Sequence, residues 1–155
     1  MFLFTLSFLA GCTEKEELSE NAKIAKNYLT DSGYEVIEHD KDGEHTFSTS
    51  DMKSIFVQQV WAVQDKDPDD YINKRIDTVS FFIKNHHLDN EYDMGKTYAT
   101  VWLRDGNVIG GWSFPTSKTN DLNGAPYTLN GKTAEEIRPG NHLKWVEDWH
   151  KKYGR

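Results

Sequence analysis

The acidic segments of this sequence are the first places to look for metal chemistry. Residues 65–70 place Asp at the first, third and fifth positions of a calcium loop. Such a loop also needs Gly at its sixth position and a bidentate Glu at its twelfth. The chain has Asp70 and Ile76 at those positions. We therefore exclude an EF-hand and interpret the segment as a solvated loop with an Asp N-cap.

A pair of histidines, His86 and His87, lies in a second acidic stretch. The neighbouring carboxylates are Asp89, Glu91 and Asp93. Zinc needs three or four convergent ligands, whereas adjacent side chains diverge on a regular strand or helix. We expect a polar loop over residues 86–96, and no metal or cofactor site in the chain.

Known nucleotide-binding and catalytic motifs are incomplete in this sequence. Residues 131–133 end like a P-loop, but the glycine needed earlier in that motif is replaced by Pro126, which has no N–H for a phosphate. Glu147 and His150 have the i, i+3 spacing of di-iron sites, which need two such pairs, so we predict a local helix ion pair. A serine triad assembled from residues distant in sequence stays open.

Composition excludes several classes of protein. The 155 residues include 18 Lys and Arg against 25 Asp and Glu, which gives a net charge of −7. Broad nucleic-acid binding needs a basic surface and is therefore excluded. A single Cys cannot form an intramolecular disulfide or a Cys-rich zinc or iron–sulfur site. The 5 Trp and 7 Tyr indicate a folded core that depends on aromatic side chains.

The first twelve residues, MFLFTLSFLAGC, are uncharged and mostly apolar, and the polar TEKEE follows them. The run is too short to cross a bilayer but suits the h-region of a signal peptide. Leu9-Ala10-Gly11-Cys12 resembles the lipobox of bacterial lipoproteins. The resemblance implies that residues 1–11 are removed and that Cys12 carries a diacylglycerol and acyl chains such as palmitate. It also implies an extracytoplasmic protein held at the cell membrane.

Two features bear on this interpretation. No Lys or Arg precedes Lys15, whereas signal peptides usually begin with a basic region. The alternative is a buried N-terminal helix or strand with an ordinary core Cys. On the lipoprotein interpretation, residues 12–17 are the lipidated Cys with a short tether, and residues 18–155 are one domain.

Hydrophobic spacing predicts the elements of that domain. Residues 14–32 repeat apolar positions at helical spacing, with a capping box at Thr13 or a later start at Ser19, and Gly33 suits the helix end. We expect a strand at 34–38, a turn at 40–43, a returning strand at 45–48 and another strand at 75–84. A second helix is predicted from Ser50 or Asp51 to Val63, with one face formed by Met52, Ile55, Phe56, Gln59, Val60 and Val63.

The strongest local signal is a hairpin over residues 97–114. Asp105-Gly106 suits a type I′ turn, which pairs Arg104 with Asn107. Continued without interruption, the register sets Leu103 opposite Val108 and Ala99 opposite Trp112 on a core face. Gly110-Gly111 is a candidate for a bulge or a close backbone approach. The other face carries our candidate binding surface, formed by Trp102, Tyr98 and Ile109.

The C-terminal part predicts a short strand at 127–129, a capping box between Thr133 and Glu136, and a final helix from Asn141. Together these elements predict an α+β fold: an antiparallel sheet of about four or five strands packed with an N-terminal and a C-terminal helix.

Residues 98–115 and 127–137 also resemble an uncharacterised domain of small lipoproteins from Gram-positive bacteria. No catalytic residues come with this resemblance. We expect a monomeric binding or interaction module with a protein or cell-wall polymer as its partner. The alternatives are a cell-envelope hydrolase that uses loop carboxylates, and a regulator or inhibitor of an envelope protease, the latter by fold-level analogy.

Overall fold

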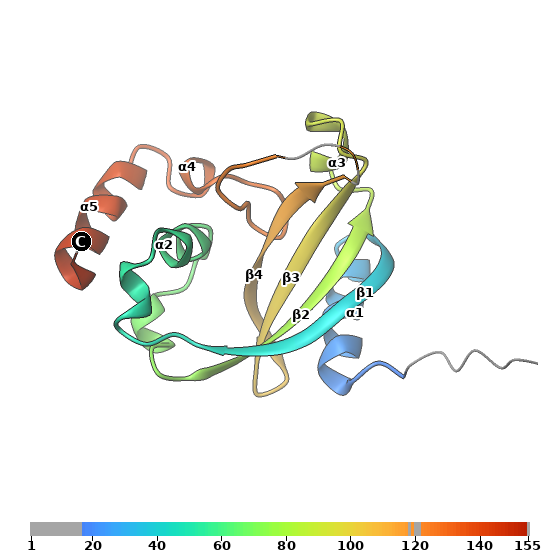
Figure 1. Ribbon diagram of the computed structural model, residues 1–155, viewed down its shortest axis with the longest axis horizontal. Coiled ribbons are helices and arrows are strands. Elements are labelled where there is room, and N and C mark those ends of the chain that lie inside the picture. The colour runs from blue at the N-terminus through green and yellow to red at the C-terminus, as the bar shows by residue number, and fades with distance from the viewer. Residues whose placement is uncertain (1–16, 118, 120–121, 155) are drawn as a thin grey trace, which may run out of the picture.

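The computed structural model describes residues 17–117, 119 and 122–154. The predicted signal peptide and Cys12 lie outside the described residues. Four antiparallel strands form one sheet in the order β1-β2-β3-β4: β1 (Glu35–Thr46), β2 (Arg75–Lys84), β3 (Lys96–Arg104) and β4 (Asn107–Thr116). Helix α1 (Glu20–Asp31) covers one side of the sheet, and α2 (Ile55–Ala62) and α5 (His142–Tyr153) lie on the other side (Figure 1). The expected α+β fold is confirmed.

Helix α1 begins at the later of the two predicted positions. The hydroxyl oxygen of Ser19 accepts a hydrogen bond from the Ala22 N–H at 3.0 Å, which satisfies one of the free donors of the first turn. At the other end, Gly33 has φ +91°. The N–H of Tyr34 donates to the Leu29 carbonyl, as in a Schellman motif. Thr13, the earlier candidate for the cap, lies outside the described residues.

The core between α1 and the sheet follows the predicted pattern. The buried face of α1, which includes Ala22, Ala25 and Leu29, packs against alternate residues of β2 and β3. The strand residues in this cluster are Val79, Phe81, Ile83, Ala99, Val101 and Leu103. Their alternation places the intervening side chains on the opposite face of the sheet.

Strand β1 corrects the expectation of two short strands and a turn over residues 34–48. It is one continuous edge strand paired with β2. The register shifts between Val36 and Glu38 and again between His39 and Lys41, so the regular alternation is interrupted twice. An exposed, charged edge strand carries no apolar period, and bulges of this kind are one way in which proteins protect a free edge.

The β3–β4 hairpin confirms the turn and corrects the register. Asp105 and Gly106 have φ +50° and +72°, as a type I′ turn requires. Leu103 pairs with Val108 as predicted. Beyond that pair a bulge shifts the register by one residue, so Trp112 pairs with Thr100 and not with Ala99. A one-residue shift moves a side chain to the other face of a sheet, which takes Trp112 away from α1.

The second core lies on that other face and is largely aromatic. It joins the sheet to α2 and α5, with α2 lying between the sheet and α5 (Figure 1). Trp102 is 4% exposed, and its ring meets Trp61 edge-on with 5.2 Å between centroids. The expectation of Trp102 as an exposed binding group is therefore wrong. The buried members of this cluster are Phe47, Met52, Val57, Val60, Trp61, Ile76, Trp102, Trp149 and Tyr153.

The predicted second helix is divided in two and rotated about its axis. Residues Asp51–Lys53 form the short helix η1, extended backbone at Ser54 (ψ 135°) interrupts it, and α2 follows. Ile55 and Phe56 are 58% and 57% exposed, whereas Trp61 is buried. The large indole of Trp61 takes the core position, which turns Ile55 and Phe56 outward. Both apolar side chains therefore remain open to solvent.

Candidate functional site

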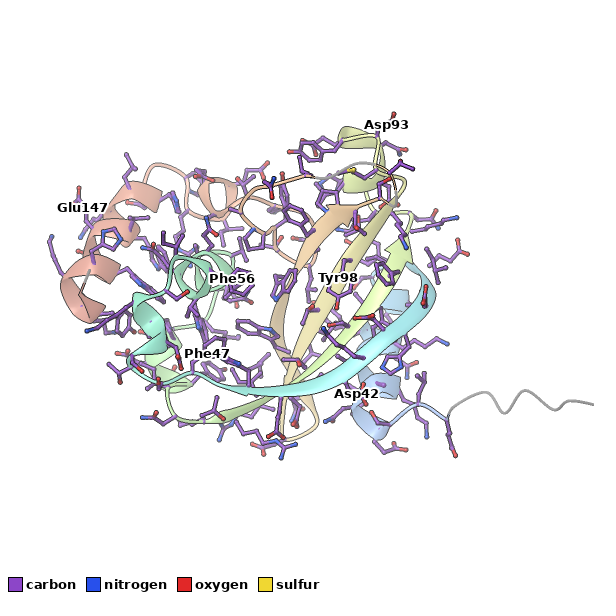
Figure 2. The ribbon with its side chains drawn as sticks, viewed as in Figure 1. Asp42, Phe47, Phe56, Asp93, Tyr98 and Glu147 are labelled. Atoms are coloured by element: carbon purple, nitrogen blue, oxygen red, sulfur yellow. The ribbon has the colours of Figure 1, made fainter. Side chains whose placement is uncertain are left out.

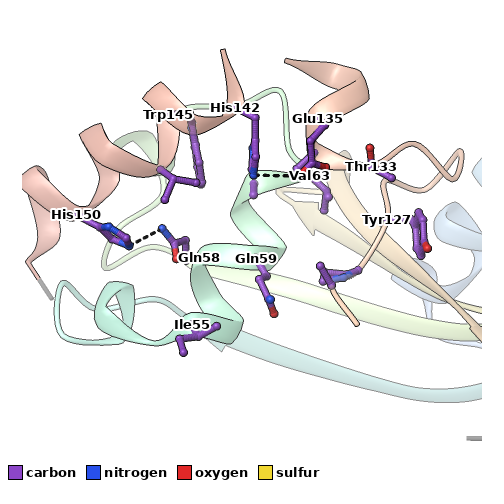
Figure 3. A pocket seen from close by; sticks show the side chains of 15 residues that line it. Ile55, Gln58, Gln59, Val63, Tyr127, Thr133, Glu135, His142, Trp145 and His150 are labelled. Carbon is purple, nitrogen blue, oxygen red and sulfur yellow. Dashed lines mark hydrogen bonds and ion pairs between the residues drawn. The ribbon is translucent and has the colours of Figure 1, made fainter. Parts of the chain in front are cut away.

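A hollow lined by apolar and polar side chains lies between α2, the short helix α4 (Ala134–Ile137) and α5 (Figure 3). Its volume is about 440 Å³. Apolar side chains form much of its wall, and a few polar groups converge in it, which is the usual composition of a ligand pocket. The polar and aromatic residues of the wall are Gln58, Gln59, Tyr127, Thr133, Glu135, His142, Trp145 and His150.

Helical spacing brings these side chains together. Helix α2 contributes Gln58 and Gln59, and α5 contributes His142, Trp145 and His150. Positions three and four apart lie on the same side of a helix. His142, Val146 and His150 are each four apart and Trp145 is three from His142, so these α5 residues form one stripe that lines the pocket. His150 was identified in the sequence only as a partner for Glu147. Its role in a pocket follows from the packing of α5 on α2.

The capping box at α4 positions the carboxylate of the pocket. Thr133 accepts a hydrogen bond from the Glu136 N–H, and the Glu136 carboxylate accepts one from the Thr133 N–H at 2.7 Å. This confirms the predicted capping box. Glu135, which precedes Glu136 in that first turn, has its carboxylate 3.4 Å from Nε2 of His142. It is the single carboxylate among the described residues that line the pocket.

A second polar contact links the two helices across the pocket. The Gln58 side-chain nitrogen lies 3.1 Å from Nε2 of His150 (Figure 3). An amide nitrogen only donates, so this ring nitrogen of His150 accepts. Figure 3 marks no such contact between Gln59 and the other side chains drawn. The pocket thus presents amide and imidazole groups, which both donate and accept hydrogen bonds.

Arg138 holds the wall of the pocket in place. Its guanidinium donates to the carbonyl oxygens of Ala62 and of Gln64, the latter at 2.6 Å. These carbonyls lie at the C-terminal end of α2, where a cation is favourable. The same guanidinium lies over the Trp145 ring, 4.8 Å from its centroid. Arg138 is therefore a positioning residue that ties α2 to the indole of α5.

The predicted binding surface of Trp102, Tyr98 and Ile109 is not one exposed patch. Trp102 is buried, and Ile109 packs at the margin of the second core. Tyr98 is half-buried, and its hydroxyl donates to the Asp40 carboxylate at 2.7 Å. Tyr98 does line a separate hollow of about 330 Å³, with Phe56 and Trp112 among its other walls.

The acidic segment at residues 65–70 makes structural contacts within the fold. Tyr153 donates to the Asp69 carboxylate at 2.6 Å, and Lys152 pairs with the same carboxylate. These contacts hold the pKa of Asp69 below its usual value. Asp67 caps the short helix η2 (Pro68–Asp70) by accepting from the Asp69 N–H at 3.0 Å, as predicted.

The histidine pair corrects two expectations. The rings of His86 and His87 do not diverge: they stack, with centroids 4.9 Å apart. Their Nε2 atoms each lie 3.2 Å from a backbone oxygen, of Leu129 and Gly131 respectively. The segment is also not a plain polar loop, because it contains the short helix α3 (Leu88–Glu91) and buries His86 and Asp89. Left-handed backbone at Asn85 (φ +64°) precedes the pair and breaks the regular geometry on which divergence depends.

Among the described residues, no group of three or more His, Cys, Asp or Glu side chains is arranged to hold a metal ion. None of the helices in this described part of the chain has the length and apolar character needed to cross a membrane.

Comparisons of the chain with known protein families, with curated proteins and with solved structures find no match.

Proposed function

We propose that this chain is a lipid-anchored extracytoplasmic binding protein, and that the pocket between α2 and α5 binds an uncharged polar ligand. The anchor rests on Leu9-Ala10-Gly11-Cys12, which resembles a lipobox. The binding activity rests on one observation: amide and imidazole groups from two helices converge around Trp145 in an open pocket.

The chemistry of the wall favours a neutral ligand. Gln59 offers both donors and acceptors, and Glu135, the one carboxylate among the described residues of the pocket wall, already faces His142. Burial and the hydroxyl of Tyr92 raise the pKa of Tyr127, so its phenol stays uncharged. The net charge of −7 disfavours anions in general.

Binding without catalysis fits the same residues. The hydroxyl of Thr133 is engaged as a helix cap, so it is a poor nucleophile. A general acid at neutral pH needs a carboxyl with a raised pKa. Where the surroundings shift a carboxyl pKa among the described residues, they lower it, at Asp51, Asp69 and Asp148. These observations favour a binding module over a hydrolase.

The experiment is an NMR titration of the full chain in detergent micelles. The probes are chitobiose, a neutral sugar dimer, and an alanine tripeptide blocked at both ends. We expect one neutral probe to shift the side-chain signals of Gln58, Gln59 and Trp145. Gln59→Leu should weaken that probe about tenfold, and Asn90→Leu, the matched change at an exposed position of helix α3, should not. Failure of both probes to shift these signals overturns the proposal.

A further inference from the structure

The pair of exposed apolar residues at the start of α2 separates two hollows. Ile55 lines the pocket already described, and Phe56 lines the smaller hollow on the sheet. Pro126 lines both. The two hollows are therefore adjacent, with the first turn of α2 and Pro126 contributing to the walls of both.

The smaller hollow has an aromatic wall. Figure 2 shows Phe56 on α2 and Tyr98 on β3 on facing sides of the space between the helix and the sheet. Phe56 meets Trp112 edge-on with 6.3 Å between centroids, and Tyr98 lies 5.9 Å from Trp112. Phe114 extends the wall along β4. No Lys, Arg, Asp or Glu is among the described residues that line it.

An uncharged sugar chain has the chemistry that matches both hollows. A sugar ring has an apolar C–H face, which packs on an aromatic ring, and a rim of hydroxyls, which hydrogen-bond to amides and imidazoles. The first hollow supplies polar groups such as Gln59 beside Trp145, and the second supplies aromatic faces with no charged side chain among the described residues of its wall. An acidic polymer would be repelled by a chain of net charge −7, which favours an uncharged ligand.

An extended peptide fits less well. Peptides in grooves beside sheets gain affinity by pairing their backbone with a free strand edge. Beside this hollow, the β4 backbone at Ser113 is already paired with Tyr127 through two hydrogen bonds of 2.9 Å. The Ser113 hydroxyl also donates to the Thr128 carbonyl at 2.7 Å.

We propose that the pocket beside Trp145 and the hollow beside Trp112 are two subsites for one uncharged sugar chain, which passes over Ile55 and Phe56. This inference rests on the proposed function, because it takes the first subsite to be the binding pocket. Linking two weak contacts in one ligand raises affinity without any new contact at either site. A long chain therefore binds more tightly than a short one.

Calorimetry on the full chain in detergent micelles tests this with chitobiose and chitohexaose, which are neutral sugar chains of two and six units. We expect the longer chain to bind at least about tenfold more tightly. Phe56→Ala should remove that difference and leave the binding of chitobiose unchanged. Leu143→Ala is the matched control, because Leu143 is 79% exposed and lines neither hollow.

Each outcome separates this inference from the proposed function. Equal affinity for the two sugars in the unaltered chain, or a length dependence that Phe56→Ala leaves intact, overturns the second subsite alone. If the blocked peptide binds and neither sugar does, a sugar chain is wrong as the ligand, and the pocket remains a binding site. Phe56 is largely exposed, so its replacement by Ala leaves the core intact, and a melting curve checks this.

Discussion

The side-chain amide of Gln64 and the backbone of Gly111 exchange two hydrogen bonds. The Gln64 amide nitrogen donates to the Gly111 carbonyl at 2.8 Å, and the Gly111 N–H donates to the Gln64 side-chain oxygen at 3.0 Å. The same amide nitrogen also donates to the Val60 carbonyl at 2.8 Å. Gln64 is buried, and it thus fastens the end of α2 to the bulge of β4, which holds both hollows in place.

Gln64→Leu should destabilise the fold strongly. The change keeps the approximate volume of the side chain but leaves both backbone groups of Gly111 without a partner. Each buried polar group left unpaired costs roughly 1–3 kcal/mol. Urea denaturation measures the free energy of unfolding, and Gln59→Leu on the open side of α2 is the control, expected within about 0.5 kcal/mol of the unaltered chain. Similar losses for both variants would contradict this role.

The glycine beside this contact gives an independent prediction. Gly110 has φ +157°, and a Cβ there would collide with the Gln64 side-chain oxygen. Gly110→Ala should therefore lower the free energy of unfolding, and less so in a chain that already carries Gln64→Ala. The double-mutant cycle measures this coupling. Gly124→Ala, with nothing within 4 Å of the added carbon, is the control, and strictly additive effects at positions 110 and 64 would rule out the collision.

The two tryptophans of the hairpin should differ in their effect on stability. Trp102 is buried in the second core, and Trp112 is half-buried beside the open hollow. Trp102→Ala should cost about 3–5 kcal/mol, and Trp112→Ala should cost less. This order is the reverse of the one that an uninterrupted hairpin register implies. If chemical denaturation shows that Trp112→Ala loses more unfolding free energy than Trp102→Ala, the uninterrupted register is supported instead.

Stability should fall in mild acid because of His86. Its Nδ1 accepts from the Leu88 N–H at 3.3 Å, so its Nε2 donates to the Leu129 carbonyl. Burial lowers the pKa of His86 below the ordinary value of 6.5, although the contact with the Leu129 carbonyl acts upward. The stacked His87 adds a smaller downward effect, which outweighs the upward effect of Asp89. A proton on Nδ1 would also face the Leu88 N–H.

The unfolded chain therefore binds a proton at His86 more readily than the folded chain does. Stability from this group is fully present above pH 6.5 and is lost as the pH falls from there towards the lower folded-state pKa. We expect the urea midpoint to fall between pH 7.5 and pH 5.5. His86→Gln, whose amide can both donate and accept, should show a shallower fall over that interval. Equal slopes in the two proteins would assign the effect to other groups.

The proposed lipid anchor predicts where the protein is found in a bacterial cell. Cys12 with two or more acyl chains gives the double hydrophobic signal that stable anchoring requires. The expressed protein should enter the detergent phase on phase separation, and Cys12→Ala should move it to the aqueous phase. Mass spectrometry measures whether residues 1–11 have been removed and whether Cys12 carries lipid. An aqueous protein that retains residues 1–11 would overturn the lipoprotein interpretation.

Local signals determined several parts of this structure. The sequence predicts the end of α1 at Gly33, the Asp105-Gly106 turn, the Thr133 capping box and the bounds of β2. Each of these features depends on residues within a few positions of one another. Their backbone preferences and short hydrogen bonds act before any distant segment is in place.

The tertiary structure decided the remainder, and with it the candidate site. The register of β4 depends on the approach of Gln64, which lies 47 positions from Gly111. Helix α2 is oriented so that Trp61 is buried while Ile55 and Phe56 are exposed, although all three side chains are apolar. Helical spacing does not distinguish such candidates, because burial is set by what the other elements offer. The polar residues of the pocket come together only in this orientation of α2.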